Sequence, residues 1–432
     1  MSGLKYRNMK YNEALEYIHS LERFGIKPGL ERIERICDLA GNPQDSLRFI
    51  HVAGTNGKGS ASTVAASILT ECGYKTGLFT SPYVTDFRER VMIDGEMADP
   101  DLLTECIEEI KSITDKYEIP ATEFEFITAA AFLYYKKGNC DYVVLEVGLG
   151  GRFDATNIIK SPEAAMIMSI SFDHIAVLGN TIEKIAFEKC GIIKEKSKVI
   201  SYPLQRDDAL EVIRSTCNSK QAELIIPDLS GLKITKRRID GTEFSYKGIN
   251  FNLHLAGDHI VYNAITAIEA VLAVIPDIDY KFISSGVSKV KMPARTEVIG
   301  YKPTVILDGG HNEDCAKALR KYIDDFLGSR KIIMVSSLMN DKEFDKYLEI
   351  LLPAVNKFIA AKACVPRAAE VSDLISSASK YCNNCIPVPD PIDAVNKALD
   401  EAGENDAVIV CGSFYLAGEV RNHLIERINN RG

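Results

Sequence analysis

A glycine-rich segment, HVAGTNGKGS at residues 51–60, has the residue types of a phosphate-binding loop. Its glycines are spaced more closely than in the common G-x-x-x-x-G-K-[ST] pattern; the residues concerned are Gly54, Gly57, Lys58, Gly59 and Ser60. Glycines let backbone N–H groups converge on an anion, and a helix that begins here adds its positive dipole end. Lys58 supplies a full charge, and Ser60 a hydroxyl for phosphate or magnesium. A tight strand-to-helix turn with an incidental lysine is the simpler alternative.

Further polar residues follow predicted strands. Glu146 ends the apolar run DYVVLEV, and Asp173 and His174 follow the next predicted strand. Because the carboxyl ends of parallel strands form one edge of a sheet, we expect these side chains near the glycine-rich loop, where Mg²⁺ needs oxygen ligands. Lys189 lies in a predicted helix among apolar residues. From spacing alone, a structural acid, a structural histidine and a solvent-directed lysine remain alternatives.

A second set of polar residues lies near the middle and later part of the chain. Arg295 follows Pro293, which breaks a helical pattern, and the segment LDGGHN contains Asp308 and His311. Asp308 ends another predicted strand, so we expect it to face a cleft between domains. A linker salt bridge for Arg295 and a plain turn after Asp308 are the alternatives.

The elements that must position these residues alternate between β-type runs and segments of helical periodicity, as in parallel α/β sheets. Residues 232–255 instead alternate polar and apolar residues around an Asp240–Gly241 turn, which predicts antiparallel strands appended to the main sheet. The predicted fold is therefore α/β. A P-loop-containing, mostly parallel sheet domain with this antiparallel addition spans residues 1–295, and a smaller Rossmann-like α/β domain spans residues 296–432.

Composition limits the class of protein. A length of 432 residues predicts two domains, and a net charge of -9 argues against a dedicated nucleic-acid binder. No apolar run approaches the roughly 18 residues of a membrane span, and the polar N-terminal segment lacks a signal-peptide core. The 11 cysteines indicate reduced thiols, with Cys382 and Cys385 interpreted as an incidental pair. We therefore expect a cytoplasmic protein without nucleic-acid or membrane partners.

Taken together, the motifs resemble the Mur ligase superfamily and, more narrowly, the folylpolyglutamate synthase and dihydrofolate synthase family. Counterparts occur in order along nearly the whole chain: GLERI, HVAGTNGKGS, GLFTSPYV, RERV, ATEFEFIT, LEVGLGGRFDATN, DHIAVLG, FEKCGIIK, DHIVYNA, PAR and LDGGHN. GTNGKGS together with GLGGRFDATN is highly specific, and the extra glycine of the loop is the family's own form. Tyr83, Ala294 and Gly310 replace the family's usual histidine, glycine and alanine. We expect Ala294 to stiffen an interdomain hinge, because alanine has less backbone freedom than glycine.

The resemblance implies roles residue by residue. The residues implied to bind ATP are Gly57, Lys58, Gly59, Ser60, Asn263, Arg295 and Asp308. The implied metal ligands are Ser81, Glu146 and His174, and the implied pterin-site residues are Thr122, Phe153, Asp154 and Ala155. Lys189 matches a lysine that these enzymes can carry as a carbamate, and it joins Lys58, His174 and His311 as implied catalytic residues. Ser413 falls where the second domain closes on ATP and the incoming glutamate.

The implied activity is ATP-dependent amide ligation through an acyl phosphate, with ATP, Mg²⁺, L-glutamate and a folate or dihydropteroate as small-molecule partners of a monomer. A peptidoglycan-precursor ligase of the Mur type is one alternative. The absence of an obvious UDP-binding domain before residue 51, and the motifs ATEFEFIT and GLGGRFDATN, favour the folate branch. A non-catalytic nucleotide-binding module is the other alternative, and it leaves Glu146, His174 and the LDGGHN segment without a role.

Overall fold

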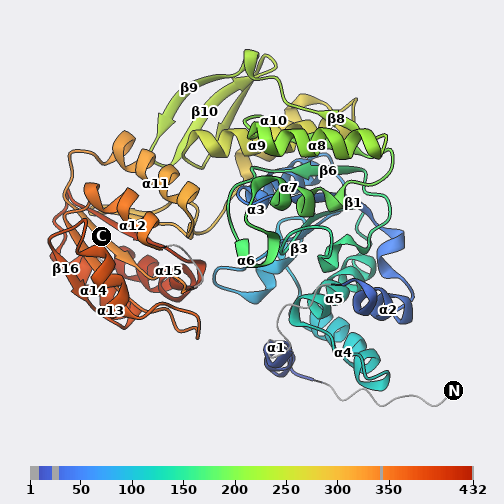
Figure 1. Ribbon diagram of the computed structural model, residues 1–432, viewed down its shortest axis with the longest axis horizontal. Helices are drawn as coiled ribbons and strands as arrows, with labels where there is room; N and C mark the ends of the chain where they lie inside the picture. The colour runs from blue at the N-terminus through green and yellow to red at the C-terminus, as the bar shows by residue number, and fades with distance from the viewer. Residues whose placement is uncertain (1–8, 22–28, 341–343, 431–432) are drawn as a thin grey trace. The chain divides into compact units, whose positions relative to one another are not determined.

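The structure, a computed structural model, describes residues 9–21, 29–340 and 344–430 (Figure 1). Residues 1–8 of the N-terminal segment considered above lie outside this set. The chain forms two compact units that are not consecutive in sequence. The first takes in the described residues of Met1–Ser81, Arg88–Gly231 and Tyr262–Val287, and the second those of Pro82–Phe87, Leu232–Val261 and Ser288–Gly432. The boundary expected near residue 295 therefore divides the chain differently from these units.

The first unit contains an eight-stranded sheet with the order β4-β3-β2-β5-β1-β6-β7-β8. Strands β2, β5, β1, β6, β7 and β8 run parallel, and β3 and β4 add an antiparallel edge. The bounds are β1 Arg48–Ala53, β2 Thr76–Phe79, β3 Val91–Ile93, β4 Glu96–Met97, β5 Tyr142–Glu146, β6 Ala164–Ile167, β7 Lys198–Ser201 and β8 Glu223–Ile225. The carboxyl ends of the central strands β5, β1 and β6 meet at one edge, which places the segments that follow them side by side.

Helices cover this sheet. Apolar side chains of α7 and α8 pack against Ala165, Ile167 and Val199 of β6 and β7, and Phe132 of α5 contacts Phe49 of β1. The helix bounds are α1 Tyr11–Ser20, α2 Glu31–Leu39, α3 Lys58–Glu71, α4 Pro100–Lys116, α5 Glu123–Lys137, α6 Ile175–Leu178, α7 Ile182–Lys189, α8 Asp207–Ser219, α9 Asp258–Val274 and α10 Tyr280–Lys289. The short 3₁₀ helices are η2 Pro43–Ser46, η3 Phe87–Arg90, η4 Ala155–Ile158, η5 Cys190–Ile192, η6 Leu229–Gly231 and, in the second unit, η7 Leu352–Ala354.

The second unit contains a six-stranded sheet with the order β12-β13-β17-β14-β15-β16, parallel except for β12. Successive residues of its strands point to opposite faces: Ile306 packs with α11, α12 and α13, whereas Val305 and Leu307 pack with α14 and α15. The bounds are β12 Glu297–Tyr301, β13 Thr304–Leu307, β14 Ile332–Ser336, β15 Lys357–Ala360, β16 Cys385–Pro387, β17 Ala407–Cys411, α11 Glu313–Phe326, α12 Phe344–Leu351, α13 Val371–Ala378, α14 Pro391–Glu401 and α15 Phe414–Asn429. The predicted Rossmann-like α/β arrangement is confirmed.

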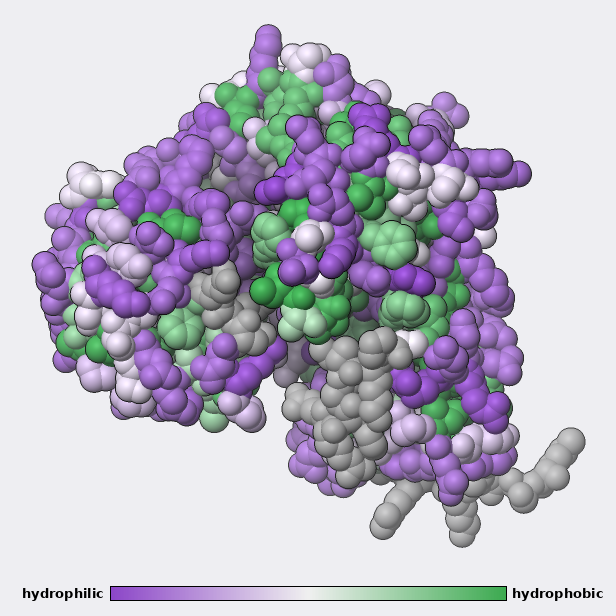
Figure 2. All heavy atoms as spheres, in the orientation of Figure 1, coloured by the Kyte–Doolittle hydropathy of each residue, from purple (hydrophilic) through white to green (hydrophobic). Residues whose placement is uncertain are grey.

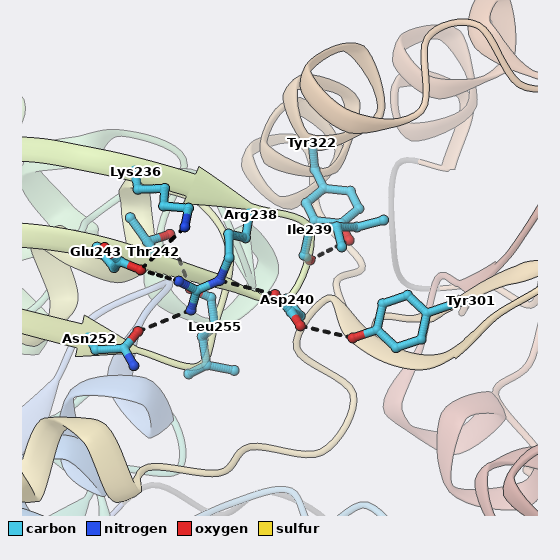
Figure 3. A network of polar contacts seen from close by, with 10 residues as sticks. All are labelled: Lys236, Arg238, Ile239, Asp240, Thr242, Glu243, Asn252, Leu255, Tyr301 and Tyr322. Atoms are coloured by element: carbon cyan, nitrogen blue, oxygen red, sulfur yellow. Dashed lines mark hydrogen bonds and ion pairs between the residues drawn. The ribbon is translucent and has the colours of Figure 1, made fainter.

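The predicted antiparallel strands are present as β9 Lys233–Arg238, β10 Gly241–Tyr246 and β11 Ile249–Leu253. They form a separate three-stranded sheet, so the expectation that they extend the main sheet was wrong. Figure 3 shows why the β9–β10 turn belongs with the second unit: the Tyr322 hydroxyl donates to the Ile239 carbonyl at 2.7 Å, and the Tyr301 hydroxyl to Asp240 Oδ2 at 2.8 Å. Arg238, which contacts Asp240, Glu243 and Asn252, fixes the strand ends behind this turn.

Two general expectations bear on where the protein acts. In the part of the chain that the structure describes, no helix is long and apolar enough to cross a membrane. Each of the 11 cysteines, all of them described, is a free thiol. The Cys385 thiol lies 3.1 Å from the Cys382 carbonyl oxygen, and burial raises the pKa of Cys385 to about 11. A thiol with so high a pKa is a poor nucleophile, which agrees with the interpretation of an incidental pair.

Candidate active site

The glycine-rich loop joins β1 to α3, as its sequence predicts. Gly54 and Gly57 have φ values of 153° and 86°, which side-chain-bearing residues rarely adopt. A Cβ on Gly57 would lie 2.4 Å from Asn263 Oδ1, and a Cβ on Gly54 would lie 2.5 Å from Met168 Cβ. Both positions therefore require glycine, and Asn263 of α9 lies directly beside the loop.

The loop is hydrogen-bonded to the segment that follows β6. Thr55 donates its N–H to the Ser169 carbonyl at 2.8 Å and its hydroxyl to the Ser171 carbonyl at 3.1 Å. Helix α3 begins at Lys58, and Ser60 lies buried in its first turn. The free N–H groups of that turn and the Lys58 ammonium together provide the positive environment that a phosphate requires. Gly59 lies in the same turn.

Glu146 is the last residue of β5 and pairs with Val52, close to the start of the loop. Its side chain is buried, and its Oε2 accepts the N–H of Ser81 at 3.2 Å. Two of the three predicted metal ligands thus lie together at the carboxyl edge of the sheet. Carboxylate and hydroxyl oxygens fit Mg²⁺, which uses few protein ligands and keeps water or phosphate in its remaining positions.

The third predicted ligand, His174, stands at the start of α6 with φ 49° and a side chain that is 37% exposed. Its Nε2 lies 3.9 Å from Asp173 Oδ1. Among residues 9–21, 29–340 and 344–430, no group of three His, Cys, Asp or Glu side chains is arranged to hold a metal. The metal role of His174 therefore stays a prediction, and a metal here would need oxygen ligands from substrate or water.

Lys189 is the last residue of α7 and is almost fully buried. Its Nζ donates to the carbonyl of Gly54 at 2.9 Å, which places the amine directly under the phosphate loop. Burial, together with the charge of Lys58, lowers the pKa of Lys189 to about 7. After Lys189 the chain continues as the 3₁₀ helix η5, where Gly191 packs so closely against Arg152 that a Cβ on it would lie 2.4 Å away.

The predicted pterin-site residues fall into two groups. Thr122 caps α5, and both its N–H and its hydroxyl bond Glu125, so this side chain shapes a turn. Asp154 is buried and accepts from Leu149 N and Thr156 N within its own loop, while Ala155 is buried in η4. Phe153 and its neighbour Arg152 are the exposed residues of this loop. The Arg152 guanidinium lies 4.7 Å from the Phe153 ring centre, so an aromatic and a cationic group are available together.

Further hydrophobic side chains are exposed beside this loop. Figure 2 shows hydrophobic residues gathered over α6, and the exposed ones include Phe172, Ile175, Val177 and Phe187. The Arg152 guanidinium also lies 5.4 Å from the Phe187 ring centre. Their exposure was not predicted from the sequence, because no spacing pattern distinguishes these apolar side chains from buried ones.

In the second unit, the turn that carries Arg295 is fixed on both sides. Ala294 and Thr296 have φ values of 54° and 44°, in the left-handed region. The Ala294 N–H donates to Glu297 Oε2 at 2.9 Å, and Glu297 forms a two-pronged ion pair with Arg421. This pair holds the turn, and sequence reasoning did not identify it.

Of the remaining predicted residues of the second unit, Arg295 and His311 lie near Phe414 at the start of α15. The Arg295 guanidinium lies 4.2 Å from the ring centre of Phe414, and the His311 ring centre lies 6.4 Å from it. Asp308 accepts the N–H of Thr296 at 2.9 Å through Oδ2. Ser413 caps α15, accepting the Leu416 N–H at 3.1 Å. Phe414 is thus a shared neighbour of Arg295 and His311, and it was not identified from the sequence.

Models of known families match most of the chain. The Mur ligase middle domain matches residues 52–271, and the Mur ligase glutamate ligase domain matches residues 294–414. The chain is 34% identical over 430 residues to the dihydrofolate synthase/folylpolyglutamate synthase of Bacillus subtilis, covering 96% of this chain and 99% of that protein. This chain belongs to the folylpolyglutamate synthase/dihydrofolate synthase family of Mur ligases. The predicted resemblance is confirmed.

Solved structures of folylpolyglutamate/dihydrofolate synthases agree with this assignment. The Escherichia coli FolC protein in complex with DHPP and ADP is 28% identical, covers 97% of this chain and 99% of its own, and superposes with a TM-score of 0.87. The bifunctional Yersinia pestis enzyme, complexed with AMPPNP and a Mn ion, is 27% identical, with coverages of 98% and 100% and a TM-score of 0.84. The predicted α/β fold, with its parallel sheets and antiparallel additions, is confirmed.

Proposed function

We propose that this chain is an ATP-dependent amide ligase that adds L-glutamate to dihydropteroate, to a reduced folate, or to both. The observation that carries the proposal is the convergence at one phosphate loop of Lys58, the buried carboxylate Glu146 and the buried amine of Lys189, whose Nζ bonds the loop at 2.9 Å. Family membership and the DHPP and ADP bound to the Escherichia coli protein support the substrate class. A peptidoglycan precursor has no comparable support.

The chemistry needs two steps. A substrate carboxylate oxygen attacks the γ-phosphorus of ATP, forming an acyl phosphate as ADP leaves; the amino nitrogen of glutamate then attacks the acyl carbon, and phosphate leaves with the bonding electrons. Catalysis of the first step is mainly positioning and charge neutralisation. Lys58 and the N–H groups of the first turn of α3 serve this purpose, and Gly57, Gly59 and Ser60 shape their site.

Mg²⁺ is proposed as the metal, and Glu146 and Ser81 are its proposed ligands in this chain, with His174 as a third. When bound, the ion neutralises charge on the phosphate oxygens. The Mn ion in the Yersinia pestis structure supports a divalent ion in the family. The position of the buried Glu146 carboxylate at the end of β5, beside the start of the glycine-rich loop, also supports this role, because carboxylate oxygens are ligands that Mg²⁺ prefers.

Lys189 is proposed to carry a carbamate. Its neutral amine attacks CO₂, the new N–C bond forms, and one proton leaves to solvent. This reaction needs an unprotonated amine near neutral pH, and burial, which lowers the pKa of Lys189 to about 7, supplies it. The product would place an anion beside Gly54, where the neutral amine was.

The other predicted roles follow the two units. In the first, Asn263 is proposed to bind adenine, and Phe153 with the segment around Asp154 and Ala155 to bind the pterin; Thr122 contributes through the start of α5. In the second, Arg295 and Asp308 are proposed to bind phosphate and ribose, with His311 and Ser413 near the glutamate. The clustering of Arg295 and His311 around Phe414 supports a shared role. We also propose a cytoplasmic monomer.

One experiment tests the function and its substrate together. The protein is incubated with ATP, Mg²⁺ and glutamate, with dihydropteroate and tetrahydrofolate offered separately, and the products are identified by mass spectrometry. We expect a product heavier by one glutamate residue and an equal amount of ADP. ADP formation without a glutamylated product, or nucleotide binding without turnover, would contradict the proposal and favour the non-catalytic module.

Lys58→Ala supplies the internal control. We expect it to lower glutamate-dependent ADP formation by at least about a hundredfold, because it removes a charge that stabilises the transferred phosphoryl group. Lys184→Ala, which removes an exposed lysine of α7, is the matched variant and should retain wild-type turnover. Equal activity of Lys58→Ala and wild type would contradict the phosphate-loop assignment.

A further inference from the structure

His51 is a buried titratable group to which the proposed reaction gives no role. It lies in the central strand β1, three residues before Gly54, and has no exposed surface. Its Nε2 lies 2.9 Å from the Thr156 hydroxyl, which comes from the 3₁₀ helix η4 more than a hundred residues later. A core position of this kind is normally occupied by an apolar residue.

The Thr156 hydroxyl connects His51 to a buried carboxylate. Thr156 Oγ1 lies 2.5 Å from Asp154 Oδ1, which also accepts the Thr156 N–H at 3.0 Å, and Asp154 Oδ2 accepts the Leu149 N–H at 2.9 Å. Because the carboxylate oxygens accept from these donors, the single hydroxyl proton of Thr156 points to Asp154. The hydroxyl oxygen then accepts a hydrogen bond from His51.

This order of donors fixes the form of the histidine. His51 must carry its proton on Nε2, and its Nδ1 lacks a hydrogen-bond partner among the described residues. Burial, with a smaller effect from the charge of Lys194, lowers the pKa of His51 to about 3, so the ring is neutral. An apolar side chain would avoid the free-energy cost of burying an acceptor that has no hydrogen-bond donor. The presence of a histidine at position 51 is therefore better explained by the hydrogen bond that its Nε2–H donates to Thr156 than by its packing in the core.

The segment that His51 anchors also contacts the helix of Lys189. The Arg152 N–H donates to the Glu188 carbonyl at 2.8 Å, and the Asn157 side chain donates to the carbonyls of Arg152 and Gly191 at 3.0 and 3.1 Å. Residues 149–157 are thus attached at one end to β1 and along their length to α7 and η5. Phe153 lies between these attachments.

We infer that His51 is a positioning residue that, through Thr156 and Asp154, sets the place of the proposed pterin-binding segment relative to the phosphate loop. The inference rests on the proposed function for its kinetic consequence. A side chain that only fills the core would affect stability alone. A positioning donor also affects the use of the pterin substrate, because carboxylate and γ-phosphate must meet at a fixed distance.

The kinetic test compares two substitutions of similar size at position 51. His51→Gln keeps an N–H donor that can reach Thr156, and His51→Met does not. We expect His51→Met to raise KM for the pterin substrate about tenfold while changing KM for ATP less than about twofold, and His51→Gln to return the pterin KM to within about threefold of wild type. Equal pterin KM values for Gln and Met would overturn the inference.

A second pair of variants, at position 156, tests the inference if substitutions at position 51 prevent folding. Thr156→Val removes the hydroxyl while keeping the shape, and Thr156→Ser keeps the hydroxyl. We expect Val, and not Ser, to reproduce the rise in pterin KM. In the double variant His51→Met/Thr156→Val, the rise should be no larger than in either single variant, because both remove one connection. A multiplicative rise would contradict a shared connection.

The tautomer supplies a readout that needs no activity. In the wild-type protein with ¹⁵N-labelled histidine, long-range ¹H–¹⁵N spectra should show His51 protonated at Nε2 and bare at Nδ1, unchanged between about pH 6 and about pH 8; His51→Gln identifies the signal. A proton on Nδ1, or a charged ring, would overturn the inference. Failure of the wild type to make glutamylated product would instead contradict the proposed function, whatever the tautomer.

Discussion

The phosphate-loop end of the first unit and the Arg295 turn of the second hold their charged side chains by different means. In the first, Lys189, Glu146 and Asp154 are buried, and burial shifts the pKa values of Lys189 and Asp154 away from their usual range. In the second, Arg295 keeps access to solvent, and its backbone is held by left-handed residues on either side and by the Glu297–Arg421 pair.

The two regions differ in what their structure controls: the first sets the protonation state of its side chains, and the second sets the position of one. Burial changes which protonation state a group adopts, so it suits side chains whose reactivity must be altered. A fixed turn leaves the chemistry of a guanidinium unchanged and decides only where it points. Substitutions in the first region should therefore change pH dependence and rate, and those in the second should change nucleotide affinity or stability.

The largest effect is expected at Lys189. Lys189→Ala should lower turnover by at least about a hundredfold, because it removes a group beside the phosphate loop, and a small carboxylate such as acetate should restore part of it. Wild-type turnover should rise with pH through about 7, since the neutral amine accumulates above the pKa of Lys189. Initial rates at saturating substrate with and without acetate measure both effects.

Lys189→Arg is the matched control for this prediction. It keeps a cation in the pocket and cannot form the carbamate under these conditions, so we expect low activity and no rescue by acetate.

The dependence of stability on pH gives a separate check of the buried amine. The folded-state pKa of Lys189 is lowered, so between pH 10.5 and about pH 7 the unfolded chain binds a proton that the folded chain does not, and stability falls as the pH falls through this window. Lys189→Met should remove this slope. Wild-type activity in Lys189→Ala would remove the carbamate from the proposal.

An intermediate effect is expected at Arg421. Arg421→Met removes the partner of Glu297, whose Oε2 holds the Ala294 N–H, and should loosen the turn that carries Arg295. We expect KM for ATP to rise about three- to tenfold with little change in the pH profile. Arg320→Met, which removes an exposed ion pair on α11, is the control and should leave KM for ATP unchanged. A shifted pH profile in Arg421→Met would break the distinction between the two regions.

The smallest effect is expected at Ala294. Alanine at φ 54° is strained, so Ala294→Gly relieves strain while it loses a buried methyl group and gains entropy in the unfolded chain. These opposing contributions should leave the free energy of unfolding within about 1 kcal/mol of wild type. Ala417→Gly, at a buried position in helix α15, has no strain to relieve and should lose more stability in the same denaturant titration. Equal losses would show that the turn is not strained.

Much of the first region could be predicted because its signals are local. The loop glycines, Lys58 and Ser60 follow one another, and Glu146 ends an apolar run, so their meeting follows from the geometry of parallel strands. The antiparallel strands at residues 232–255 were equally visible, yet their attachment to the first sheet was predicted wrongly. The placement of these strands depends on the hydrogen bonds that Tyr301 and Tyr322, two residues far away in the sequence, donate to the β9–β10 turn.

The sequence by itself determined the family, the phosphate loop and the order of strands and helices, because each rests on residue types at short spacing. Only the tertiary structure decided which side chains became unusual. The pKa of Lys189 is lowered because its amine is buried against Gly54, 135 residues away in the chain. The Nε2–H of His51 finds its hydrogen-bond acceptor only in Thr156, 105 residues away in the chain. Desolvation and hydrogen-bond partnership are properties of packed neighbours, so no spacing within the chain encodes them directly.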